Sequence, residues 1–143
     1  MKFFVSYRSA DSKKVDPIIA RLRSLKDDNG EPVYKVWQDK DSIPVGQDWW
    51  EAICEGILGC DVFIFMVSRE SIRSAPCLAE LSFAHELNLP LIPFVLEGEW
   101  VYNSSGKYDI EFWDEIPSEL QDDVRHVPLP HRGKVDPRGD SRL

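Results

Sequence analysis

The sequence has few cysteines and histidines, which limits the kinds of site that it can build. Its three cysteines, Cys54, Cys60 and Cys77, are odd in number, irregularly spaced and set among apolar residues. We therefore expect free, buried thiols in a reducing compartment rather than a disulfide framework or a zinc site. The three histidines show no HExxH motif or other paired-ligand spacing, so we expect no metal centre.

Long apolar runs are also missing, and positive charge is scarce. No run approaches the about 20 residues of a membrane-spanning helix, and no signal peptide opens the chain, which predicts a cytoplasmic protein. Seventeen Lys and Arg face 25 Asp and Glu in 143 residues, for a formal net charge of −8. Such a field repels phosphates, so we expect neither a nucleic-acid nor a membrane partner, although a local basic patch remains compatible with this charge.

Several standard nucleotide and hydrolase motifs are absent. No GxGxxG follows the first apolar run, and the sequence contains neither GxxxxGK[ST] nor GxSxG. The early acidic pair and late lysine of a phosphoacceptor receiver are missing as well. These absences argue against a classical dinucleotide fold, a P-loop enzyme, an α/β-hydrolase and a receiver domain.

What the sequence does show is an alternation of apolar and amphipathic runs, the pattern of strand–helix–strand units. It predicts an α/β fold: a doubly wound, flavodoxin-like three-layer sandwich around a central, mostly parallel five-stranded sheet. The most apolar run is expected to be the central strand, and the proline at position 93 indicates a strand near an edge. The expected strands are residues 3–7, 33–37, 61–67, 91–96 and, as the fifth, 124–128.

Three amphipathic runs predict the helices between these strands. The first is expected to start at Asp16-Pro17, because proline is favoured in a first turn. The second starts at about Asp48, ends at Gly59, and carries Trp50, Ile53 and Ile57 on one face. The third covers Cys77–Leu89; Cys77, Leu81, Ala84 and Asn88 share its sheet-facing side, and Glu80 lies at the margin of that side.

The C-terminal third is less regular. Residues 97–123 are strongly acidic and are expected to be irregular, with a short helix near their end. The stretch after the last expected strand contains Pro and Gly, has net positive charge and lacks apolar periodicity. We therefore expect one domain over residues 1–128, followed by a flexible tail or the start of a linker over 129–143. In doubly wound sheets ligands bind beyond the carboxyl ends of the strands, so the loops of interest begin at Tyr7, Gln38, Ser68 and Glu97.

Three motifs in these loops resemble the Toll/interleukin-receptor (TIR) domain family, in its bacterial and plant-like, NAD-cleaving form. Phe4–Asp11 (FVSYRSAD) resembles the first conserved box, and Asp39–Gly46 (DKDSIPVG) the second. Ser68, followed after a gap by Cys77–Leu81 (CLAEL), resembles the third region, and Leu91–Val95 the strand after it. The motifs stand in family order over residues 1–96, with a looser match to about residue 128.

The resemblance implies cleavage of NAD⁺ at the nicotinamide–ribose bond, with Glu80 as the catalytic glutamate by position. NAD⁺ is then the substrate, no resident cofactor or metal is expected, and the products are nicotinamide and ADP-ribose or a cyclic isomer. The chemistry is reasonable for one carboxylate, because bond cleavage leaves an oxocarbenium-like ribose that it can stabilise. Nicotinamide leaves as a neutral ring and needs no general acid. The ordinary alternative is that Glu80, in a first helical turn, only complements the helix dipole.

Further residues are candidates for binding NAD⁺, each with an ordinary alternative. An arginine just past the first strand can pair with the diphosphate or can simply be exposed. Aromatic residues can pack against a nucleotide ring or belong to the core. A serine that ends a strand can bind a ribose hydroxyl or form a turn. The expected binding set is Phe4, Tyr7, Arg8, Ser9, Trp37, Asp39, Ser68 and Cys77.

The resemblance also implies partners and a second possible function. Family members are often activated by oligomerisation through the second-box loop, here residues 38–49, and are fused to or associated with a sensor domain in immune and antiviral signalling. The alternative function is a noncatalytic TIR–TIR adaptor or scaffold. Catalytic members commonly carry Trp before the Cys of the third region, whereas this chain has Pro76 there. Because the indole is missing, the activity can be weak, altered or dependent on assembly.

Overall fold

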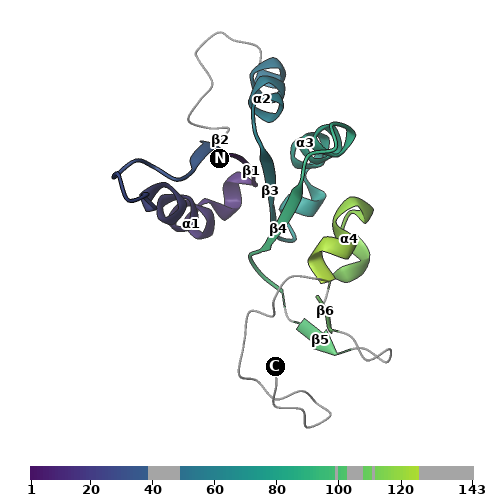
Figure 1. The fold of residues 1–143 in the computed structure, drawn as a ribbon. Helices are drawn as coiled ribbons and strands as arrows, with labels where there is room; N and C mark the ends of the chain where they lie inside the picture. Colours follow the sequence, from purple (N-terminus) through teal and green to yellow (C-terminus); the bar gives the residue numbers. More distant parts are fainter. Residues whose placement is uncertain (39–48, 99, 103–107, 111, 126–143) are drawn as a thin grey trace.

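The computed structural model describes residues 1–38, 49–98, 100–102, 108–110 and 112–125. Four parallel strands, β1 (Lys2–Ser6), β2 (Lys35–Gln38), β3 (Val62–Val67) and β4 (Leu91–Val95), form a sheet in the order β2-β1-β3-β4 (Figure 1). The helices are α1 (Ser12–Ser24), α2 (Trp49–Leu58), α3 (Ala75–Glu86) and α4 (Ser118–Arg125). The expected α/β architecture is confirmed.

The sheet differs from the expectation in having four strands rather than five. Residues 124 and 125 of the expected fifth strand belong to α4, and residues 126–128 lie outside the described part. The acidic region is also more regular than expected, because β5 (Trp100–Tyr102) and β6 (Tyr108–Ile110) form a separate antiparallel pair. Aromatic and β-branched residues in both short segments favour strands despite the surrounding acidic charge.

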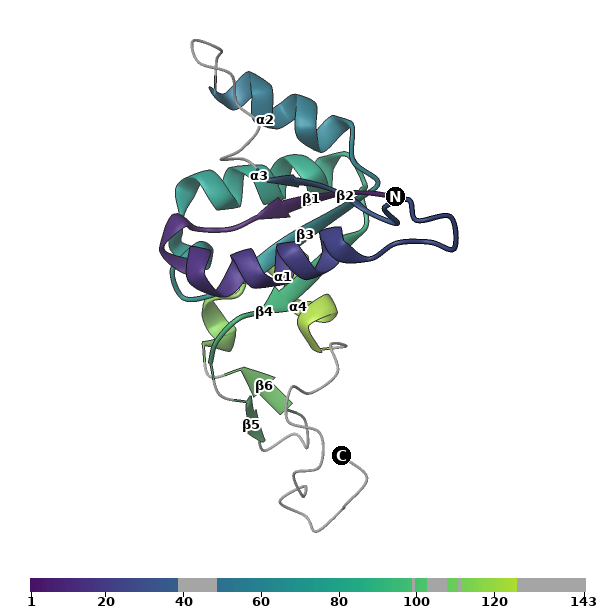
Figure 2. The same cartoon turned by 90° about the vertical axis from the view of Figure 1, so that its left-hand side faces the viewer.

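The helices form two layers around the sheet. Helix α1 covers one face, whereas α2, α3 and α4 cover the other (Figures 1 and 2). This arrangement follows from right-handed crossovers, because the chain moves outward from β1 to β2 and then returns across the sheet to β3. The direction of winding therefore reverses between β1 and β3, and the carboxyl ends of these two strands form the topological switch point where such folds bind ligands.

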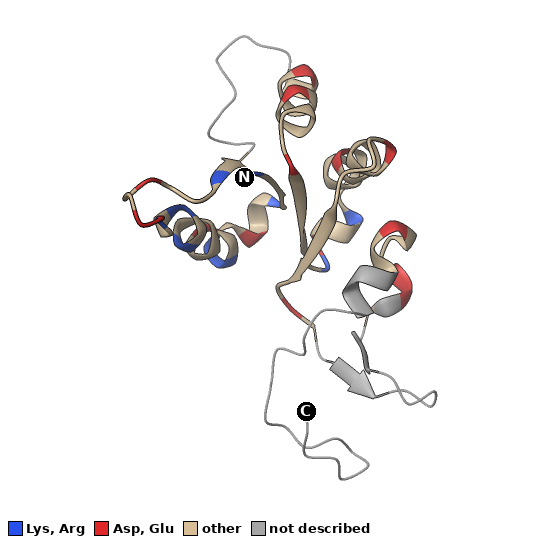
Figure 3. Cartoon of the chain, viewed as in Figure 1, with Lys and Arg blue, Asp and Glu red and all other residues tan. Residues whose placement is uncertain are grey.

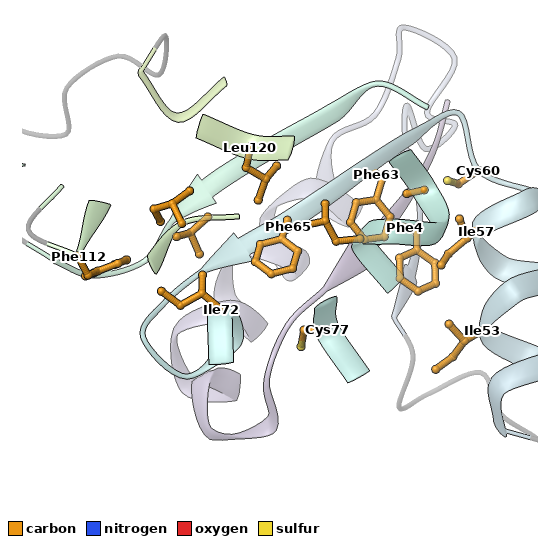
Figure 4. Packing of buried hydrophobic residues seen from close by; sticks show 14 residues of the cluster. Phe4, Ile53, Ile57, Cys60, Phe63, Phe65, Ile72, Cys77, Phe112 and Leu120 are labelled. Atoms are coloured by element: carbon orange, nitrogen blue, oxygen red, sulfur yellow. The ribbon is translucent and has the colours of Figure 1, made fainter. Parts of the chain in front are cut away.

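Two apolar clusters, one on each face, hold the layers together. All six residues of β3 are buried, which confirms it as the central strand. On the α2–α3 side, the ring of Phe4 stacks on Trp37, at a centroid distance of 4.7 Å, and on Phe63, at 5.4 Å. Figure 4 shows Phe4 and Phe63 within this cluster. On the other side, Val5, Val15 and Met66 are among the residues that pack α1 against the sheet.

Both outer strands show how the edges of the described sheet are finished. At β2, Arg23 of α1 donates a hydrogen bond from Nη2 to the outward carbonyl of Val36, at 3.0 Å. At β4, Pro90 O accepts from Phe63 and Leu96 N donates to Val67 O, so the even-numbered residues face β3. Pro93 therefore turns its nitrogen outward, where no ladder bond is lost, and its predicted position near an edge is confirmed.

The helix boundaries depart from the predictions in ways that packing explains. Helix α1 begins at Ser12 rather than at Asp16-Pro17, because Val15, fully buried against the sheet, secures the first turn. Helix α2 does end before Gly59, but of the three residues expected on one face, Ile53 and Ile57 are fully buried whereas Trp50 is 38% exposed. Helix α3 stops at Glu86 instead of Leu89, because Asn88 adopts a left-handed backbone with φ of 57°.

Candidate functional site

A buried polar bridge joins the loops at the switch point. Ser68, which directly follows β3, donates a hydrogen bond from its hydroxyl to the Asp11 carboxylate, at the start of α1. Ser71 completes this bridge: its hydroxyl donates to the carbonyl of Met66 at 2.6 Å and accepts from the Ser68 backbone at 2.9 Å. Ser68 is fully buried, so a ribose hydroxyl could reach it only by replacing these internal bonds.

A second polar group lies at the carboxyl ends of β1 and β2. The Gln38 amide Nε2 donates to the Tyr7 hydroxyl at 2.8 Å and to Asp16 Oδ1 at 3.2 Å. These three side chains line a cavity of about 380 Å³ between α1 and β2. Its remaining lining residues are Ser12, Ile19, Ala20 and Arg23.

The structure separates two aromatic residues that the sequence analysis assigned to one binding set. Phe4 is fully buried in the cluster under α2 and α3, and Trp37 is half-buried beside it. Tyr7 is buried in the cluster on the α1 side. Phe4 and Tyr7 therefore lie on opposite faces of the sheet and cannot enclose the same nucleotide ring. Arg8 and Ser9 are exposed in the loop after β1, which leaves their side chains accessible.

Helix α3 carries the candidate catalytic residue. It begins with a side-chain cap, in which the Ser74 hydroxyl accepts a hydrogen bond from the Cys77 backbone at 3.4 Å, and Pro76 occupies the first turn. Cys77 and Leu81 are buried on the sheet-facing side, as the helical spacing predicted. Glu80 was expected at the margin of this sheet-facing side, and there its side chain is buried, with 1% exposed.

Helices α2 and α3 pack against each other beside this margin. Trp50 of α2 meets Phe83 of α3 edge to face, at a centroid distance of 6.4 Å, and Phe83 lies on the Glu80 side of the helix. Glu80 lines neither the cavity beside Tyr7 nor a larger one of about 480 Å³ between α2 and the starts of β1 and β2. In this arrangement a dinucleotide does not reach the carboxylate.

A salt-bridged carboxylate, Glu97, connects the loops after β3 and β4 to helix α1 at the same end of the sheet. Its Oε1 accepts from the Arg69 backbone at 2.7 Å, and its Oε2 lies 3.4 Å from Lys14 Nζ of α1. The hydrogen bond from Arg69 and the charge of Lys14 lower the pKa of Glu97. The Arg69 guanidinium also lies 4.9 Å from the centre of the Phe112 ring. The sequence pattern indicated Glu97 only as the start of a loop.

Some expected features lie outside the described residues or have no counterpart among them. Asp39 and residues 39–48 of the second-box loop are not described. Within the described ranges there is no group of three or more His, Cys, Asp and Glu side chains placed to hold a metal ion. No helix in those ranges is both long enough and apolar enough to cross a membrane. Of the three cysteines, Cys60 and Cys77 are buried and Cys54 is half-buried, and none of them forms a disulfide within the described ranges.

Several solved structures share this fold at low sequence identity. The TIR domains of the activated Roq1 resistosome, which directly recognises the pathogen effector XopQ, match with a TM-score of 0.51 at 18% identity, over 66% of this chain and 56% of that one. A metazoan TIR-STING receptor from C. gigas matches with a TM-score of 0.61 at 18% identity, over 85% and 35%. A 2-desoxiribosyltransferase from Leishmania mexicana matches with a TM-score of 0.52 at 14% identity, over 77% and 79%.

These likenesses establish the fold alone. The chain covers 56% and 35% of the first two structures, so it spans only part of their length. No protein of curated function matches the sequence. The family model for the TIR domain, in contrast, matches residues 3–127 and includes all three motifs. On this match, together with the doubly wound sheet, the chain belongs to the TIR domain family.

Proposed function

We propose that this TIR domain is an NAD⁺ nucleosidase that cleaves the nicotinamide–ribose bond with Glu80. The observation that carries the proposal is a glutamate side chain, 1% exposed, on a helix that packs an otherwise apolar side against the sheet. Burying a carboxylate costs free energy, so packing alone gives no reason for an acid at this position. A buried titratable group in a family's functional motif is instead a candidate for catalysis.

The chemistry requires one carboxylate and a leaving group that departs without a proton. As the bond to nicotinamide breaks, positive charge develops on the ribose, and an ionised Glu80 stabilises that charge. The pair of electrons of the broken bond neutralises the pyridinium, and nicotinamide leaves as a neutral ring. Water then attacks the anomeric carbon and gives ADP-ribose with release of a proton, or a hydroxyl or ring nitrogen of the same molecule attacks and gives a cyclic isomer.

The burial of Glu80 adds a condition to this proposal. The side chain is buried, and neither cavity described above includes it. Catalysis therefore needs a rearrangement that exposes Glu80, and we propose that self-association supplies it. The likeness to the TIR domains of the activated Roq1 resistosome supports assembly, and the recognition of a pathogen effector by that resistosome supports a role in immune signalling. Specific activity is then expected to rise steeply with protein concentration.

Nicotinamide release from NAD⁺ tests the proposal directly. The full chain is assayed over a range of concentrations, with and without a crowding agent. Glu80→Gln keeps the size of the side chain and removes its charge, and it should lower release at least about a hundredfold. The matched control is Glu86→Gln, at an exposed position on the same helix, which should leave release unchanged. Equal release by the Glu80 variant would show that another group does the chemistry.

A noncatalytic interaction module is the second candidate function, and exposed apolar side chains favour it. Trp49 and Trp50 at the start of α2 are 45% and 38% exposed, and Leu58 near its end is 61% exposed. Together with Pro76 in place of the expected Trp, this surface suits docking to another domain. A chain that assembles at high concentration but never releases nicotinamide would support the adaptor and would overturn the enzyme.

A further inference from the structure

The larger of the two cavities lies far from the carboxyl ends of the strands and has no role in the proposed reaction. It has a volume of about 480 Å³, within the range of about 300 to 1,000 Å³ typical of small-molecule sites. It opens between α2 and the beginnings of β1 and β2. Small residues of α2, Ala52 and Gly56, and Gly59 directly after the helix line it and leave room for it.

Two lysines stand side by side at this cavity. Lys2 and Lys35 are paired in the register of β1 and β2, and both line the cavity. Because neighbouring strands lie about 4.8 Å apart, the two side chains leave the sheet as adjacent like charges, which is unfavourable. Neither ammonium forms an ion pair with a carboxylate within the described part of the chain. The cavity thus has two ammonium groups in a protein of net charge −8, in which Asp and Glu are visible on α2 and α3 (Figure 3).

The other polar groups nearby define what would complement the two lysines. Glu55 of α2 is the one acidic residue among those that line the cavity. Asp61 directly follows Cys60, which also lines the cavity. The Asp61 carboxylate accepts a hydrogen bond from the Lys2 backbone at 2.8 Å. Burial raises the pKa of the Cys60 thiol, with Asp61 contributing, so this thiol is neutral and does not repel an anion. The cavity thus offers two cations at one place and a carboxylate acceptor at another.

We infer that this cavity binds a nucleotide, with its phosphate on Lys2 and Lys35 and its ribose hydroxyls donating to Glu55. Phosphate oxygens satisfy two adjacent ammonium groups by charge-assisted hydrogen bonds, which removes the repulsion between them. A ribose diol provides the donors that an exposed carboxylate accepts. The site lies on α2 and the starts of the strands, so the inference does not rest on NAD⁺ cleavage by Glu80.

Calorimetric titration of the full chain with AMP, ribose 5-phosphate and inorganic pyrophosphate tests this inference. We expect saturable binding of AMP at one site per chain. Lys2→Gln/Lys35→Gln should weaken it at least about tenfold, since charge-assisted bonds are lost. Glu55→Gln should weaken AMP and ribose 5-phosphate but not pyrophosphate. Lys13→Gln, at an exposed position on α1, is the matched control and should bind as the unmodified chain does.

A steric variant provides an independent test. A Cβ at Gly59 would meet only the backbone oxygens of Glu55, at 3.4 Å, and Gly56, at 3.9 Å, which are ordinary contacts. Gly59→Leu therefore fills the cavity without backbone strain and should abolish AMP binding, while circular dichroism confirms the fold. Absence of saturable AMP binding, or unchanged binding by the double lysine variant, would overturn the inference. If pyrophosphate binds with the same affinity as AMP, and Glu55→Gln weakens the binding of neither, the assignment of the ligand as a nucleotide is overturned.

Discussion

A side chain at Gly56 of α2 is expected to destabilise the fold, and the structure shows why. A Cβ built at this position would lie 2.8 Å from Cε2 and 3.0 Å from Cδ2 of Trp37. Carbon atoms in contact are normally about 3.5 to 4.0 Å apart, so the indole would have to retreat by nearly 1 Å. Its retreat is blocked, because the Phe4 ring is stacked on it at 4.7 Å and Phe63 lies behind Phe4 at 5.4 Å.

The size of the effect follows from two opposing contributions. Overpacking of this kind costs about 1 to 3 kcal/mol. Alanine in a helix is more favourable than glycine by about 1 kcal/mol. Gly56→Ala should therefore lower the free energy of unfolding by about 1 kcal/mol net, measured by urea denaturation followed by far-UV circular dichroism. Gly59→Ala, whose Cβ makes ordinary contacts, is the control and should stay within about 0.5 kcal/mol of the unmodified chain.

A double-mutant cycle separates the clash from the helix preference. In a Trp37→Leu background the indole is gone, so Gly56→Ala should become stabilising by up to about 1 kcal/mol. A Gly56→Ala chain as stable as the unmodified one, or one whose effect is the same in both backgrounds, would refute the proposed contact between Gly56 and Trp37 as the reason for glycine here.

Three further substitutions test the contacts at the carboxyl end of the sheet. Glu97→Gln should cost about 1 kcal/mol at pH 7. The hydrogen bond from the Arg69 backbone lowers the pKa of Glu97 below its usual 4.5. The loss of stability caused by Glu97→Gln should therefore be full above pH 4.5 and should vanish as the pH falls through the lowered value. A loss that grows in acid would contradict this reasoning. Ser74→Ala removes the cap of α3 and should cost about 1 kcal/mol by thermal unfolding, whereas no loss would show that the cap is made otherwise. Ser68→Ala leaves the buried Asp11 carboxylate without its hydroxyl donor and should cost about 1 to 3 kcal/mol in urea; an unchanged midpoint would mean that this bridge does not stabilise the fold.

The sequence was sufficient for the four parallel strands, where its signals are strong, but not for the fifth strand, which it placed at residues 124–128. The run over β3 is apolar at every position and had to be central, and Pro93 could be accommodated only where its nitrogen faces away from the ladder. The start of α1 was missed because a local rule about Pro17 was outweighed by burial of Val15, which only the tertiary packing reveals. Local preferences are weak compared with the burial of a core side chain.

The site was harder to predict, for reasons that differ from residue to residue. Period-two alternation already places Phe4 and Tyr7 on opposite faces, so their separation could have been found from the sequence. The burial of Glu80 could not be predicted, because helical spacing places it at the margin of the sheet-facing side and only the tertiary packing around α3 decides whether that margin is buried. The hydrogen bond between Ser68 and Asp11 joins residues 57 positions apart, and no local pattern signals such a pair.

The guanidinium of Arg23 on the Val36 carbonyl has a consequence for how copies of this domain can assemble. An exposed strand edge is a template on which another chain can add a strand, and a capped carbonyl removes an acceptor from that template. The outward proline of β4 removes a donor from the opposite edge of the described sheet. Both edges therefore discourage a continuous intermolecular β-sheet. Ordered oligomers of this domain would have to form through helix and loop surfaces, and so could remain reversible instead of growing into amyloid-like fibres.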